Sequence, residues 1–80
     1  MKRKLSFNEQ HDLRTLPRRI AELEAKIREL QGVLADPGLY SRDPGLFDTT
    51  STALASHEAE LSSAEDRWLS LEMLREELGG

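Results

Sequence analysis

Cysteine is absent from the 80-residue sequence, which excludes disulfide bonds and thiolate metal sites. Histidine occurs only twice and no glycine-rich phosphate-binding loop is present, so the sequence offers no catalytic constellation. No apolar run approaches the ~18 residues of a membrane-spanning helix, and none follows the basic opening of residues 1–4. We therefore expect a cytoplasmic chain with no enzymatic activity, cofactor, metal or membrane partner.

The small size of the chain limits its architecture. Eighty residues cannot bury a large globular core, whereas two long helices can share one narrow apolar seam. Charged residues make up 32% of the sequence and hydrophobic residues 38%, which is apolar enough for such a seam and untypical of a disordered chain.

The first half of the chain carries the heptad pattern of a coiled coil. Ser6 and Glu9 have the spacing of a capping box, which predicts that a helix begins near Phe7. Pro17 interrupts the helical pattern, so we expect this arm to be kinked or broken near Leu16–Pro17, the broken form ending at about Thr15 and restarting at Pro17. Apolar residues follow in alternating steps of three and four: Leu13, Leu16, Ile20, Leu23, Ile27, Leu30 and Leu34.

The second half repeats the same spacing after a short tip. Asp36, Pro37 and Gly38 end the first arm, and Asp43 with Pro44 is typical of a helix start. We expect a basic lead-in at residues 1–5 and one domain at 6–78, with arms at 6–36 and 44–78 joined by a tip at 37–43. The second seam comprises Phe47, Thr50, Leu54, His57, Leu61, Ala64, Trp68 and Leu71.

Two seams joined by a short tip predict an all-α fold, an antiparallel two-helix coiled-coil hairpin. The connection fits a register in which paired residue numbers sum to about 84, so that Leu23 lies beside Leu61 and Leu16 beside Trp68. We expect a monomer, with self-association of two hairpins as the alternative.

Side chains around this seam carry further expectations. Leu74 and Leu78 can meet Leu5 or Phe7 at the open end of the hairpin, and Lys26 can reach Glu60. Glu24 and Glu58 face each other unfavourably. His57 is expected to be a satisfied, partly buried seam residue and Trp68 to pack in the core, with a metal or pH role and a ligand platform as their respective alternatives.

Charge is unevenly distributed along the sequence. Residues 1–40 hold eight Lys/Arg and six Asp/Glu, whereas residues 41–80 hold three and nine. A nucleic-acid contact should therefore come from the first half, although an ordinary solvated helix face explains the same charges. Tyr40 can stack on single strands or fold back to close the tip. The candidate phosphate-binding residues are Lys2, Arg3, Lys4, Arg14, Arg18, Arg19, Lys26, Arg28 and Arg42.

Specific motifs add a family resemblance. The run from Arg3 to Gln10, the Leu16–Pro17 pair, the Asp36–Pro37 tip with Leu39–Tyr40, and Arg67–Trp68–Leu69 occur in an order that resembles the C-terminal domain of Uup-type ABC-F ATPases. The resemblance spans nearly the whole chain.

This resemblance implies a coiled-coil tail domain of a cytoplasmic protein with two ATP-binding cassettes, associated in that family with DNA binding. The leading hypothesis is a non-catalytic accessory domain that binds nucleic acid, with DNA preferred and RNA or the ribosome as alternatives. A different class of function is a structural or protein-interaction hairpin that positions the parent's ATPase cassettes or contacts the ribosome.

Overall fold

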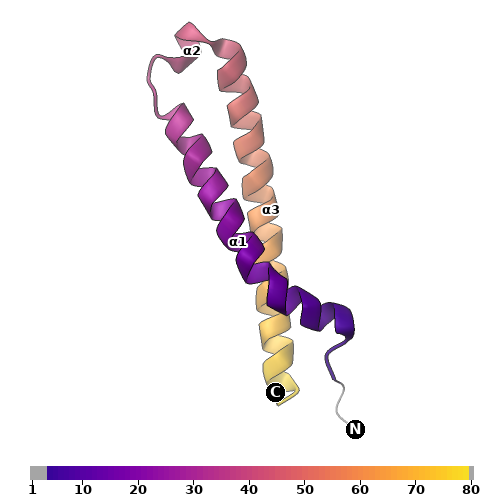
Figure 1. Cartoon of the computed structure of the whole chain (residues 1–80). Helices are drawn as coiled ribbons and strands as arrows, with labels where there is room; N and C mark the ends of the chain where they lie inside the picture. Colours follow the sequence, from indigo (N-terminus) through magenta and orange to yellow (C-terminus); the bar gives the residue numbers. More distant parts are fainter. Residues whose placement is uncertain (1–3, 80) are drawn as a thin grey trace.

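The computed structural model describes residues 4–79 and contains three helices: α1 (Phe7–Leu34), α2 (Leu39–Arg42) and α3 (Pro44–Glu77). No strand occurs within these residues, which confirms the all-α prediction. Figure 1 shows α1 and α3 lying lengthwise beside each other, with α2 at the end where the chain turns back. The molecule is an elongated rod of 63 × 16 × 14 Å.

Local side-chain hydrogen bonds fix where the two long helices begin. The Ser6 hydroxyl accepts from the Glu9 amide at 3.1 Å, and the Glu9 carboxylate accepts from the Ser6 amide at 2.8 Å. The capping box predicted from the sequence is therefore present. Asp43 accepts from the Leu46 amide at 3.0 Å, with Pro44 in the first turn of α3, as its sequence also predicted.

Ion pairs between the long helices give their relative direction. Asp12 of α1 pairs with Arg67 of α3 at 3.3 Å, and Arg19 pairs with Glu60. Because the α3 residue number falls as the α1 number rises, the two helices run in opposite directions at this level.

The two apolar rows predicted from the sequence are the residues that the fold shields. Every one of those seam positions is buried or half-buried, and Leu23 and Leu71 are each only 1% exposed. Burying one leucine side chain stabilises the folded state by about 1.5–3 kcal/mol, so a few such residues hold the two helices together. Knobs-into-holes packing and the pairing register stay predictions.

Pro17 lies inside α1, which is continuous from Phe7 to Leu34. The expectation of a broken arm is therefore wrong. Seam residues on both sides of Pro17 are shielded, and their burial opposes the loss of one backbone hydrogen bond. In Figure 1 the N-terminal turns of α1 lean away from α3, whereas a kink located at Pro17 itself stays a prediction.

The two ends of the rod differ in how well their apolar residues are shielded. At the tip, Leu39 to Arg42 form a helical turn, and Leu39 is 3% exposed. Tyr40 packs edge-to-face on Phe47, with ring centroids 5.2 Å apart. At the open end Phe7 is 79% exposed, whereas Leu5, Leu74 and Leu78 are half-buried, so the expected contact of Leu74 and Leu78 with Leu5 or Phe7 stays a prediction.

Candidate nucleic-acid interface

Three arginines share the face of α1 that points away from α3. At about 100° per residue, Arg14, Arg18 and Arg28 fall within an arc of about 80° opposite the seam. Two alanines fill the same strip, and all five residues are exposed. We call this surface the outer strip: Arg14, Arg18, Ala21, Ala25 and Arg28. No carboxylate lies within it, and it extends about 21 Å along the helix axis.

The outer strip keeps most of its positive charge available. The Arg18 side chain is 88% exposed, and its contact with Glu22 is a loose one of 3.6 Å. The Arg14 guanidinium lies 3.5 Å from the His11 ring nitrogen Nδ1, and within residues 4–79 neither Arg14 nor Arg28 forms an ion pair. These guanidinium groups can therefore meet phosphates without first releasing a tight intramolecular partner.

Other predicted cations are engaged within the fold. Arg19 donates to the Glu60 carboxylate across the seam, through Nε at 2.8 Å and through Nη2, and also contacts Glu22 at 3.5 Å. These hydrogen bonds, those to Glu60 first, raise the pKa of Arg19 above its ordinary value. Lys26 lies 3.5 Å from Glu29, so the expected contact between Lys26 and Glu60 is wrong. The longer reach and forked donors of Arg19 take Glu60 instead.

Arg42 holds the tip together. Its guanidinium donates to Asp36, whose carboxylate also accepts from the Gly38 amide at 2.9 Å. The Arg42 contact, reinforced by the Gly38 amide, lowers the pKa of Asp36. Arg42 therefore lies far from the outer strip, with its charge already compensated. Of the basic lead-in, Lys4 is exposed, while Lys2 and Arg3 lie outside the described residues.

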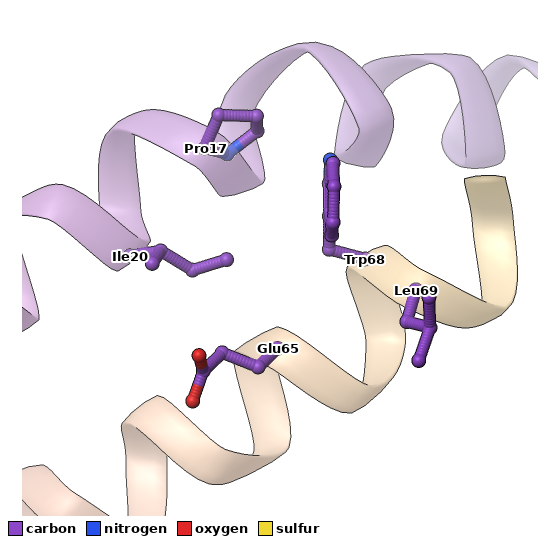
Figure 2. A pocket seen from close by; sticks show the side chains of 5 residues that line it. All are labelled: Pro17, Ile20, Glu65, Trp68 and Leu69. Atoms are coloured by element: carbon purple, nitrogen blue, oxygen red, sulfur yellow. The ribbon is translucent and has the colours of Figure 1, made fainter.

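Sequence reasoning missed a second feature of the surface, a hollow between the helices. It has a volume of about 400 Å³ and is lined by Pro17 and Ile20 of α1 and by Glu65, Trp68 and Leu69 of α3 (Figure 2). Leu69 is 54% exposed although it is apolar. In the sequence, this site is indicated only by Leu69, an apolar residue that does not belong to the heptad positions of the seam.

His57 matches the expectation of a satisfied seam residue. Its Nδ1 lies 2.8 Å from the Ala53 carbonyl oxygen, and the side chain is half-buried. Within residues 4–79 no three His, Asp or Glu side chains gather in a way that would hold a metal ion. No helix in the same range is long and apolar enough to cross a membrane.

The described residues form an all-helical rod with a basic strip on α1 and an acidic α3. The model of the family described as ABC transporter C-terminal domain matches residues 4–73. The chain therefore belongs to the ABC transporter C-terminal domain family.

The proteins to which this chain is similar are ATP-binding proteins that are much longer than the chain. A Haemophilus influenzae protein named ATP-binding protein Uup-like is 45% identical over 69 residues, which are 86% of this chain and 15% of the relative. The ATP-binding protein Uup of Caulobacter vibrioides is 46% identical over 77 residues, 96% of this chain and 13% of its own length.

The ATP-binding protein Uup of Escherichia coli is 36% identical over 72 residues, 90% of this chain and 11% of the relative. The chain thus spans 11–15% of the length of these relatives. The resemblance to the C-terminal domain of Uup-type ABC-F ATPases is confirmed. No solved structure matches the chain.

Proposed function

We propose that this chain is a non-catalytic accessory domain of a cytoplasmic Uup-like ATPase and that it binds nucleic acid, DNA in preference to RNA, through the outer strip. The domain is an antiparallel coiled-coil hairpin kinked at Pro17, and it is monomeric. The ATPase cassettes of the parent protein perform the nucleotide hydrolysis, and the hairpin contributes the nucleic-acid contact.

The strongest support is the availability of the outer-strip arginines. Arg14, Arg18 and Arg28 project from one face of a rigid helix, with two alanines and no carboxylate between them. A row of cations on a straight element can follow a phosphate backbone without reading its sequence. The acidic second arm faces away from this row, so it repels phosphate on the other side of the rod and orients the complex.

Three phosphate contacts predict a measurable salt dependence. Release of condensed counterions by three cations gives a slope of log affinity against log salt of about −2 to −3. Affinity for end-labelled DNA, measured by fluorescence anisotropy at several salt concentrations, gives this slope directly.

A matched pair of charge reversals tests the face. Arg18→Glu removes one outer-strip cation, and we expect weaker binding with a salt slope reduced by about one. Arg75→Glu makes the same charge change on α3, and Arg75 likewise has a glutamate partner, Glu72, within its own helix. We expect Arg75→Glu to leave the slope unchanged. Equal effects of the two substitutions would contradict a binding face on α1.

Exposed side chains near the tip support a second candidate function. Tyr40 of α2 is 61% exposed and Leu46 of the first turns of α3 is 45% exposed, so two large side chains with apolar surface are accessible near the tip. These residues favour docking of the tip on a protein surface of the parent ATPase or of the ribosome. Titration of the chain into the cassette region of a Uup-type relative tests it, and Tyr40→Ser with Leu46→Ser should abolish the heat of binding.

A further inference from the structure

The hollow beside Trp68 has the form of a slot for a flat group. Figure 2 shows the Trp68 ring edge-on, with one face toward the space bounded by Pro17, Ile20 and Glu65. Its volume of about 400 Å³ lies within the roughly 300–1,000 Å³ of small-ligand pockets. The walls are an aromatic face opposite aliphatic side chains, which is the environment that a planar aromatic ligand prefers.

Among the residues that the structure describes, Glu65 is the one charged side chain that lines this slot. Within residues 4–79 it forms no hydrogen bond or ion pair, so both carboxylate oxygens can accept from a ligand. An ionised carboxylate has no proton to donate, so it accepts hydrogen bonds only. The ligand must therefore present N–H or O–H groups at the edge of its flat ring.

Arg14 is the outer-strip residue turned toward the side of α1 on which Pro17 lines the slot. Pro17 lies between Arg14 and Arg18 in the sequence, and by helical geometry it stands about 60° around the helix from Arg14. Positive charge beside the slot attracts a phosphate and opposes the entry of a second cation. On the opposite wall, Glu65 repels phosphate. A phosphate bound at Arg14 therefore brings the neighbouring groups of its polymer to the side of α1 that lines the slot.

We propose that the slot binds one unpaired base of a nucleic acid strand whose backbone lies on the outer strip. The base stacks on Trp68, and Glu65 accepts hydrogen bonds from its Watson–Crick edge. This inference rests on the proposed function, and it narrows the ligand to nucleic acid with unpaired bases: single strands, gaps or branch points. In a closed duplex the same edge is already paired and the base is stacked on its neighbours.

The acceptor at the slot also sets a base preference. Guanine offers an imino N–H and an amino group side by side, which match the two oxygens of Glu65. Cytosine and adenine offer an amino group, and thymine or uracil a single imino N–H. We expect affinity for a single strand to be highest with guanine and lowest with thymine.

Trp68 is the sole tryptophan of the chain, so its fluorescence reports on the slot directly. The probes are a guanine-containing single strand of about 12 nucleotides and the duplex of that strand with its complement. Both should bind at low salt, as followed by anisotropy of an end label. Only the single strand should quench Trp68 emission.

Two substitutions with matched controls separate stacking from folding. Trp68→Leu should lower affinity for the single strand by about 5-fold or more and leave affinity for the duplex unchanged, whereas Trp68→Phe, which keeps an aromatic ring, should restore much of the loss. Glu65 is exposed and outside the seam, so Glu65→Gln keeps the fold and should reduce the preference for guanine over thymine. Glu58→Gln, one heptad away, should not. Circular dichroism verifies that each variant stays helical.

The outcomes also separate this inference from the proposed function. Salt-dependent binding that requires Arg18 but leaves Trp68 emission unchanged would overturn the base slot alone. Quenching by an arginine-rich peptide and not by the single strand would overturn it as well, in favour of a partner's cationic side chain. Absence of binding to any nucleic acid would remove the proposed function and the base slot together.

Discussion

The two flanks of the seam use charge in opposite ways. On one flank, here called the paired flank, Asp12 meets Arg67 at 3.3 Å and Arg19 meets Glu60. On the other, the open flank, Pro17 and Glu65 border a hollow of about 400 Å³. No ion pair of the described residues joins the helices there, and Glu24 and Glu58 are predicted to face each other.

The difference shows how one hairpin separates stability from binding. Cations on the paired flank are compensated by cross-helix carboxylates, so they are poorly placed to hold phosphates. Arginines of the outer strip, which lies opposite the seam, lack such cross-helix partners. A count of basic residues along the sequence cannot make this distinction, because Arg18 and Arg19 are adjacent in the chain and have different roles in the fold.

The largest expected effect is a loss of stability in the seam, which supports both flanks. Leu23→Ala removes a fully buried side chain of the seam that supports them, and we expect a loss of about 2–5 kcal/mol of unfolding free energy. Urea denaturation followed by circular dichroism measures it. Leu69→Ala is the matched control, because Leu69 is exposed and its truncation should change stability by less than about 0.5 kcal/mol. Similar losses in the two variants would contradict a seam centred on Leu23.

A smaller effect is expected from substitutions that create an opposite-charge pair on the open flank or remove one from the paired flank. Glu58→Lys places a cation opposite Glu24 on the open flank, and we expect stabilisation of about 0.2–1 kcal/mol and a higher melting temperature. Glu60→Lys, two residues along the same helix, places a cation opposite Arg19 and should lower the melting temperature. Thermal melts at low salt compare them, and the two shifts should shrink as salt is added. Shifts of the same sign would show that the flanks are electrostatically equivalent.

The smallest effect concerns the ion pair at the tip, which serves as a reference for pairs on the paired flank. Because the pKa of Asp36 is lowered in the folded state, the unfolded state binds more protons between the two pKa values. The stabilisation is therefore complete above the ordinary pKa of 3.8 and is lost as the pH falls through the lower value of the folded protein.

Melting temperatures of the unmodified chain and of Asp36→Asn, compared from neutral to acidic pH, test this dependence. The difference between the two should be constant at neutral pH and should close only in strong acid. A difference that grew as the pH fell would contradict a lowered pKa of Asp36.

The sequence by itself determined the features that depend on neighbours along one helix. The Ser6–Glu9 capping box, the Asp43–Pro44 start and the two apolar rows follow from spacing, because a helix places residues three and four apart on one face. Local geometry also placed Arg14, Arg18 and Arg28 opposite the seam. The same spacing gave the half-buried position of His57.

The tertiary structure alone decided what depends on distance across the molecule. Arg19 and Glu60 are separated by 41 positions in the sequence, and only the packing of α3 on α1 selects Arg19 over Lys26 as the partner of Glu60. The tertiary structure also decides that α1 continues through Pro17. Proline locally favours a break in the helix, and the burial of seam residues before and after Pro17 opposes that preference. The slot beside Trp68 belongs here too, since its two walls come from different helices and neither wall forms a cavity alone.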